Sequence, residues 1–112
     1  MEVSPTDEAE STEAVPGVHL TQGANGEKAS IQRFVIRPGA EVPEHEHHHE
    51  QVGTVTQGTL TFLIDGEKVP VHAGDTFAIP GGEPHGAVNA GDVPVEGFDV
   101  FAPPRIDPDW KD

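Results

Sequence analysis

The sequence predicts an all-β protein of the jelly-roll type, an antiparallel sandwich or closed barrel. Thirteen Gly and eleven Pro in 112 residues favour many short elements joined by turns over long helices. Eight to ten short runs rich in β-branched and aromatic residues follow one another at close turn spacing. No segment shows a convincing helical period. The length corresponds to one domain with a small core.

Individual strands can be placed from the turns that bound them. The run 59–64 alternates, so Leu60, Phe62 and Ile64 are predicted to face the core. Asp65-Gly66 directly after it predicts a type I′ hairpin. The stretch 23–26 is read as a turn. The other expected strands open at 18–20 and span 30–37, 52–56, 67–71, 76–79, 85–89 and 95–101.

The two ends of the chain are expected to differ from the barrel. Residues 1–17 are acidic, without a basic residue and with little to bury, which predicts a flexible acidic N-terminal arm. That leaves 18–112 as the barrel domain. Trp110 is expected to dock the C-terminal segment onto the barrel or onto a second subunit, and we expect a homodimer.

Charge and composition exclude several classes of partner. Six Lys plus Arg against twenty Asp plus Glu give a formal charge of −14, which argues against binding to nucleic acid or anionic membranes. The same acidity suits a halophilic protein from a high-salt cytoplasm, or simply a soluble one. There is no cysteine, so disulfides and thiolate chemistry are excluded. The chain shows neither a secretory signal nor a run of ~20 apolar residues, so a cytoplasmic location is expected.

The stretch 44–51 holds four of the seven histidines and lies between two β-like runs. In an extended strand, His45 and His47 would point to the same side, and Gln51 shares their parity. Two imidazoles and an amide oxygen on one face can bind a divalent metal, and His85 offers a third imidazole. The alternative is a solvated polar strand whose histidines have no role.

Glycines and prolines fall into a fixed frame around these histidines. The first motif is Gly39, five residues, His45, one residue, His47, three residues, Gln51, six residues, Gly58. The second, after fifteen residues, is Gly74, five residues, Pro80, one residue, Gly82, two residues, His85, three residues, Asn89. This frame resembles the two-motif signature of the cupins, small jelly-roll β-barrels (double-stranded β-helices). The resemblance implies a metal ion held by His45, His47, Gln51 and His85.

One fixed position departs from the cupin pattern, because most members carry Glu where this chain carries Gln51. Three neutral His and a neutral amide leave the site near the +2 charge of the metal. Such a site is a stronger Lewis acid and a poorer stabiliser of high oxidation states. The metal is expected to polarise a substrate oxygen rather than to activate dioxygen. The ligands suit Mn, Fe, Co, Ni or Zn without distinguishing between them.

The segment 99–105, Asp-Val-Phe-Ala-Pro-Pro-Arg, resembles the ending of KdgF-type pectin-degradation cupins. Their first motif, His-x-His-x-His-Glu-Gln, matches 45–51. The resemblance implies conversion of 4,5-unsaturated monouronates to linear keto acids, with Asp99, Phe101 and Arg105 in the active site. Asp99 and Phe101 share strand parity, and burial would raise the pKa of Asp99 toward a useful range for acid/base catalysis. Arg105 can bind the carboxylate of a sugar acid through two hydrogen bonds.

Other interpretations of these residues remain open. Phe101 could be ordinary core, and Arg105 could form a surface ion pair. The whole protein could instead be a quercetinase-like dioxygenase, or a sugar- or metabolite-binding cupin without activity. His49 is expected to support the metal ligands or to lie at the rim, with His48 and Glu50 facing out. His19 and His72 lie outside both motifs and are expected to be surface or strand-end residues.

Overall fold

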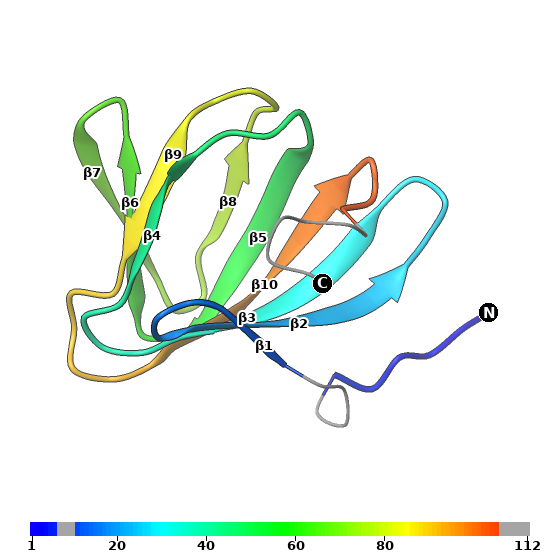
Figure 1. Cartoon of the computed structure of the whole chain (residues 1–112), viewed down its shortest axis with the longest axis horizontal. Coiled ribbons are helices and arrows are strands. Elements are labelled where there is room, and N and C mark those ends of the chain that lie inside the picture. The colour runs from blue at the N-terminus through cyan, green and yellow to red at the C-terminus, as the bar shows by residue number, and fades with distance from the viewer. Residues whose placement is uncertain (7–10, 106–112) are drawn as a thin grey trace.

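The computed structural model describes residues 1–6 and 11–105, in which every regular element is a β-strand. Two antiparallel sheets face each other (Figure 1). The six-stranded sheet has the order β1-β2-β3-β10-β5-β8, and the four-stranded sheet has the order β4-β9-β6-β7. The strands are β1 (Thr12–Val15), β2 (Val18–Asn25), β3 (Ser30–Ile36), β4 (Glu41–His45), β5 (Glu50–Gln57), β6 (Thr59–Ile64), β7 (Glu67–His72), β8 (Thr76–Ile79), β9 (His85–Val88) and β10 (Val95–Ala102).

The predicted all-β jelly roll is confirmed. The bounds of β6 and β8 match the expected strands, and β3, β5, β7, β9 and β10 agree with theirs within a few residues; β1 and β4 were not among the expected strands. Leu60 and Phe62 are buried, as the alternation predicts. Asp65 and Gly66 have φ angles of 51° and 78°, and positive φ at both central positions defines the type I′ turn.

The N-terminal region differs from the expectation in two places. Thr12–Val15, assigned to a flexible arm, forms β1 and pairs antiparallel with β2. β2 continues to Asn25, so 23–26 is not a turn. The chain turns after that strand, where the amide of Gly26 donates to the carbonyl of Ala29 at 2.7 Å. The acidic composition of this region did not predict β1. An edge strand needs few apolar residues, because pairing with one neighbouring strand satisfies the hydrogen bonds on one side of its backbone.

The core lies between the sheets, and part of it is hollow. Its buried side chains are Val18, Phe34, Ile36, Val55, Leu60, Phe62, Val71, Ile79, Ala87 and Val95. Several of them also line a cavity described below. Asn89, the last residue of the second motif, is 1% exposed and ties the β9–β10 connection. Its amide donates to the carbonyls of Ile36 and Val93 at 2.9 and 2.8 Å.

We find no helix in the described residues that is long and apolar enough to cross a membrane.

Candidate metal centre

Two of the predicted metal ligands face each other across neighbouring strands. β4 pairs with β9 so that His45 lies opposite His85, and the centroids of their rings are 4.4 Å apart. His47 does not share a strand with His45, because β4 ends at His45 and β5 begins at Glu50. The strand-parity argument is therefore wrong for this pair. The turn between the two sheets, rather than strand alternation, brings the ring of His47 to 5.1 Å from that of His85.

The β8–β9 loop holds that turn in place. The amide of Gly82 donates to the carbonyl of His47 at 2.8 Å. Gly81 lies so close to the turn that an added Cβ would be 2.3 Å from the carbonyl oxygen of His48. Only a residue without a side chain permits this approach. Gly81 and Gly82 thus hold the turn that carries His47, a predicted ligand.

Hydrogen bonds fix the tautomer of all three imidazoles. Nδ1 of His45, His47 and His85 lies 2.9, 3.0 and 2.9 Å from the carbonyl oxygens of Pro43, His49 and Glu83, respectively. Each Nδ1 must carry the proton that it donates, so each Nε2 presents a lone pair. One ring nitrogen from each residue lies within 4.8 Å of the others. Oriented, neutral imidazoles of this kind are characteristic of metal sites.

Burial keeps two of these imidazoles neutral. It lowers the pKa of His47 to about 4, with help from the charges of Arg105 and His85. Burial is also the largest cause that lowers the pKa of His85. A metal competes with protons for Nε2, so depressed pKa values leave both imidazoles able to bind a metal at neutral pH.

Gln51 shows that the site fits a cation. Its Nε2 donates to Asp99 Oδ1 at 3.0 Å, which turns Oε1 toward His47 Nε2 at 3.2 Å. Both atoms of the second pair are acceptors when His47 is neutral, so they repel unless a proton or metal ion lies near both. The depressed pKa of His47 disfavours the proton. The three histidines and Gln51 therefore have the donor atoms and orientation that a divalent transition metal requires.

Asp99 is a buried carboxyl on β10, 6% exposed. Burial is the main reason that its pKa rises to about 6, and the opposing contributions are hydrogen bonds from Gln32 and Gln51 and the charge of Arg105. Gln32 Nε2 donates to Oδ2 at 3.1 Å. Gly53, opposite Asp99 on β5, leaves room for the group, because an added Cβ would lie 3.0 Å from Oδ1. A carboxyl with this pKa can accept and return a proton near neutral pH.

Phe101 and Arg105 lie beside these groups. Phe101 is 2% exposed, and its ring is edge-on to that of His47 at 5.6 Å. The guanidinium of Arg105 lies 5.3 Å from the Phe101 ring centroid, within the range of a cation–π contact. The backbone of Arg105 is held by Ser30 Oγ and by the side chain of Gln22. Its charge lies close enough to lower the pKa of both His47 and Asp99.

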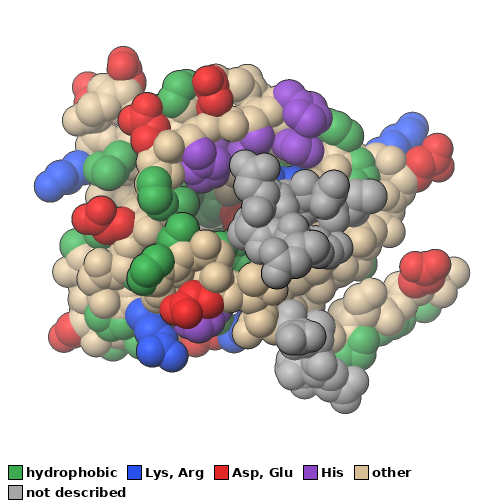
Figure 2. All heavy atoms as spheres, in the orientation of Figure 1, with side chains coloured by type: hydrophobic (Ala, Val, Ile, Leu, Met, Phe, Trp, Pro, Cys, Tyr) green, Lys and Arg blue, Asp and Glu red, His purple; other side chains and the backbone are tan. Residues whose placement is uncertain are grey.

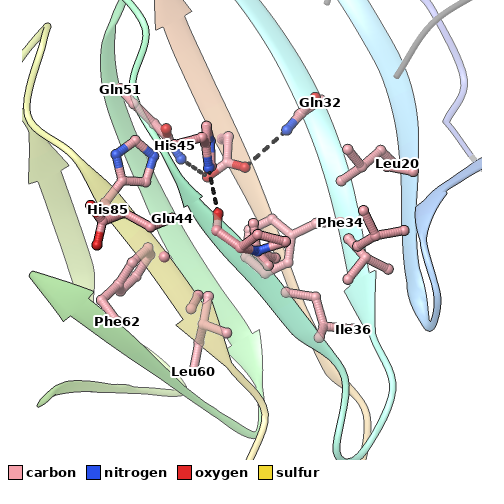
Figure 3. A pocket seen from close by; sticks show the side chains of 18 of the residues that line it. Leu20, Gln32, Phe34, Ile36, Glu44, His45, Gln51, Leu60, Phe62 and His85 are labelled. Atoms are coloured by element: carbon pink, nitrogen blue, oxygen red, sulfur yellow. Dashed lines mark hydrogen bonds between the residues drawn. The ribbon is translucent and has the colours of Figure 1, made fainter. Parts of the chain in front are cut away.

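All of the predicted site residues except His47 line one cavity of about 360 Å³. Gln32, Gln51, His45 and His85 lie at one end of it, where dashed lines mark the bonds to Asp99 (Figure 3). At the other end are Leu60, Phe62, Ile36 and Phe34. Figure 2 shows histidine side chains gathered along one edge of the molecule, with acidic groups on the same face.

The remaining histidines and the C-terminal tryptophan were also assigned from the sequence. His48 and His72 are exposed, as is Glu50. His49 is half-buried, and its ring centroid lies 5.4 Å from that of His47. His19 is half-buried, with Nε2 3.7 Å from Glu13. Trp110 lies outside the described residues.

The sequence interpretation missed Gln32 and Gly53. Gln32 shares parity with Phe34 and Ile36, but Ile31 and Val35 on the opposite parity are equally apolar, so the pattern alone does not say which set faces in. A glutamine within such a strand is the available signal. Gly53 has no signal of its own, since its role depends on the register that places it opposite Asp99.

Comparisons with known proteins agree with the fold and the motifs. Residues 32–101 match the model of the cupin domain family. The H2HPP isomerase of Bacillus subtilis is 34% identical over 67 residues, 60% of this chain and 28% of that protein. The auxin-binding protein ABP19b of Prunus persica is 34% identical over 88 residues, 73% of this chain and 42% of that protein. The matched regions therefore cover less than half the length of these curated relatives.

Solved structures of similar size superpose over nearly the whole chain. KdgF from Halomonas sp. has a TM-score of 0.86 at 28% identity and covers 96% of this chain and 97% of that one. An RmlC-like cupin from Shewanella frigidimarina has a TM-score of 0.84 at 27% identity, with 96% and 95% covered. With the family match spanning more than half of its residues, the chain belongs to the cupin domain family and resembles KdgF.

Proposed function

We propose that this protein is a metal-dependent enzyme that converts 4,5-unsaturated monouronates to linear keto acids. The observation that carries the proposal is the amide of Gln51, which joins the histidine cluster to a buried carboxyl of raised pKa. Arg105 lines the same cavity and supplies a cation for the substrate carboxylate. The likeness to KdgF from Halomonas sp. over nearly the whole of both chains supports this choice of reaction.

His45, His47, His85 and Gln51 would hold the metal. When bound, a divalent ion with four neutral ligands keeps its +2 charge and polarises a substrate oxygen. The protein's own part in metal binding is to present three Nε2 lone pairs and one amide oxygen, each already oriented by a hydrogen bond on its far side.

Asp99 moves the proton. A 4,5-unsaturated uronate is an enol ether closed as a hemiacetal. Asp99 takes the proton of the C1 hydroxyl while the bond between C1 and the ring oxygen breaks, which leaves an aldehyde at C1 and an enolate at C4–C5. The same proton, returned by Asp99 to C4, turns the enolate into the ketone and restores the carboxylate. The reaction is an isomerisation, so it consumes neither water nor oxygen, and one carboxyl with a pKa of about 6 can serve both directions.

Gln32, Phe101 and Arg105 position the reacting groups. Gln32 and Gln51 hold the two oxygens of Asp99, so the carboxylate does not need to reorganise when it accepts a proton. Phe101 covers the site beside His47 and limits the access of water. Arg105 binds the substrate carboxylate and fixes which face of the sugar ring meets Asp99.

The test uses the ultraviolet absorbance of the C4–C5 double bond. Protein loaded in turn with each candidate metal should speed the loss of absorbance above the spontaneous rate for at least one uronate isomer. An oxygen electrode should show no uptake. Arg105→Lys should mainly raise KM, because an ammonium replaces a guanidinium that makes two hydrogen bonds. If absorbance is lost only at the spontaneous rate with every uronate isomer and every metal, the proposal is rejected.

A dioxygenase is the second candidate, because a gentisate 1,2-dioxygenase of Ralstonia sp is 28% identical over 109 residues. Gln51 counts against it, since a neutral ligand stabilises a high oxidation state poorly. Stoichiometric oxygen uptake with a phenolic substrate would favour this function over the first. Binding of a sugar acid without turnover would instead favour a binding protein.

A further inference from the structure

One end of the cavity is more apolar than a monouronate requires. His45, His85, Gln51 and Gln32 lie at one end (Figure 3), and Asp99 is hydrogen-bonded to the last two of them. The other end is lined by Val18, Phe34, Ile36, Leu60, Phe62 and Ala87, which we call the inner chamber. All six side chains are apolar and at most 7% exposed.

A sugar hydroxyl placed in the inner chamber would have no side-chain partner. Burying a hydroxyl without a hydrogen bond costs about 1–3 kcal/mol in proteins. A uronate carries hydroxyl groups on most of its ring carbons, so it gains nothing from this end of the cavity. The chamber instead favours a hydrocarbon group, whose transfer from water is favourable.

The walls keep the chamber open rather than filling it. Phe34 lies against the backbone of β10 at Gly97, where an added Cβ would be 2.4 Å from the ring's Cζ. The missing side chain lets the ring lie back in the wall. On the opposite sheet, Ala87 follows His85 by two residues and contributes only a methyl group. The glycine and the alanine at these two positions take up little space, which leaves volume between the sheets.

The volume suits a ring joined to a carboxylate. An apolar cavity of about 150 Å³ lined by Leu, Ile and Phe is enough to bind benzene. The cavity here measures about 360 Å³, so a six-membered hydrocarbon ring and a short polar head fit together. Arg105 lines the same cavity and is complementary in charge to a carboxylate head.

We propose that the cavity binds arylalkanoates, with the carboxylate at Arg105 and the hydrocarbon ring in the inner chamber. This inference rests on the proposed function only for Arg105 as the carboxylate partner. It assigns a second class of ligand, recognised by apolar contacts that a uronate cannot use. Phenylacetate is the probe, and acetate is the matched ligand that lacks the ring.

The first experiment measures both affinities by calorimetry on the full chain loaded with Zn²⁺, a diamagnetic ion. Burial of the ring should make phenylacetate bind at least about tenfold more tightly than acetate. Ala87→Leu fills the chamber and should bring the ratio of the two affinities close to one, with acetate unchanged. Ala78→Leu is the matched control on β8, where Ala78 is exposed, and should keep the wild-type ratio.

The second measurement needs no variant and so stands if Ala87→Leu does not fold. Ring protons of phenylacetate should give NMR cross-peaks to the methyl groups of Leu60 and Ile36. Equal affinities for phenylacetate and acetate in the wild type, or cross-peaks confined to exposed residues, would overturn the inference. The uronate assay separates the two proposals. Turnover of uronates without preferential binding of phenylacetate would reject the arylalkanoate proposal alone. Preferential binding of phenylacetate without turnover of uronates would reject the enzymatic proposal alone.

Discussion

The two sheets contribute different chemistry to one cavity. The four-stranded sheet supplies imidazoles, with His45 on β4 and His85 on β9. The six-stranded sheet supplies the amides and the carboxyl, with Gln32 on β3, Gln51 on β5 and Asp99 on β10. The imidazoles of β4 and β9 and the carboxyl of β10 thus face the cavity from opposite walls, while His47 lies in the turn between the sheets.

Gln51 belongs to both sides of this division. Its oxygen faces His47 and its nitrogen donates to Asp99. A Glu at this position would place a second carboxylate within about hydrogen-bond distance of Asp99, and the two would share a proton. The amide avoids that repulsion, which gives a physical reason for the departure from the usual cupin pattern. Substitutions on each wall should therefore have separable effects, and only Gln51 should affect both.

Removing an imidazole from the four-stranded sheet should have the largest effect. His85→Ala cuts the link between β9 and the turn that carries His47. Metal affinity should fall at least about 100-fold, because losing only a residue that hydrogen-bonds a ligand already costs up to about that much. The melting temperature of the metal-loaded protein should also drop. Mass spectrometry of the bound metal and a thermal melt measure both. His72→Ala, on an exposed histidine, is the control. Full metal occupancy in His85→Ala would remove it from the ligand set.

A substitution on the six-stranded sheet should stop the reaction and spare the metal. Asp99→Asn keeps the size of the side chain but cannot accept a proton. We expect kcat/KM for the unsaturated uronate to fall about 10²- to 10⁴-fold, the usual contribution of a general acid or base. Metal content should match the wild type. A variant that retains full activity would show that the proton is handled by another group.

A substitution of Gln51 should shift the pH dependence of kcat/KM rather than abolish activity. Gln51→Glu puts a like charge beside Asp99, so the pKa of Asp99 should rise further. The pH at which kcat/KM reaches half its maximum should move up by about one unit or more, with metal still bound. The measurement is a pH–rate profile of wild type and variant at saturating metal. Superimposable profiles would mean that Gln51 does not control the proton on Asp99.

The sequence predicted which histidines lie together better than it predicted why they do. Motif spacing identified His45, His47, Gln51 and His85, and the structure brings the three histidines together. The supporting argument from strand parity failed because the chain turns between β4 and β5, and a run of histidines contains no turn signal strong enough to show it. Motif spacing can therefore identify residues that come together in the fold without showing whether a strand or a turn brings them together.

Asp99 could be predicted because a carboxylate stands out in an apolar strand, and the structure buries it. Gln32 and Gly53 could not, because both act through the pairing of β10 with its two neighbours. Pairing register depends on contacts between strands far apart in sequence. The edge strand β1 was missed for a related reason, since its stability comes from β2 rather than from its own residues.

In protein stripped of metal, the pH dependence of stability should reflect the titration of both Asp99 and His47. Asp99 has a folded pKa of about 6, above its ordinary 3.8, so the folded state holds the extra proton and stability falls as pH rises through this window. The shift corresponds to about 3 kcal/mol. His47 has a folded pKa of about 4, below 6.5, so its contribution is lost as pH falls. The two slopes oppose each other between pH 4 and 6.

In Asp99→Asn, the rise in stability with pH that comes from the histidines should no longer be opposed by the carboxyl. Because Asp99 opposes the combined slopes of His47 and His85, the melting temperature of the wild type should rise less steeply between pH 4 and 6 than that of the variant, which should become steadily more stable with rising pH up to about 6.5. The check is a series of thermal melts of both proteins in the presence of a chelator. Parallel curves for the two proteins would mean that the carboxyl is not held protonated by burial.

Salt should have the smallest effect and should act outside the cavity. The formal charge of −14 is carried by twenty acidic residues, and the exposed ones repel one another across the surface. Raising KCl to molar levels shortens the screening length to about 3 Å. We expect stabilisation on the order of 1 kcal/mol, about 4–8 °C in melting temperature for a domain of this size. Asp99→Asn should show the same salt slope, because that carboxyl is buried and solvent ions screen buried charges far less. A flat or falling melting curve would leave the acidic surface as an aid to solubility and end the halophilic interpretation.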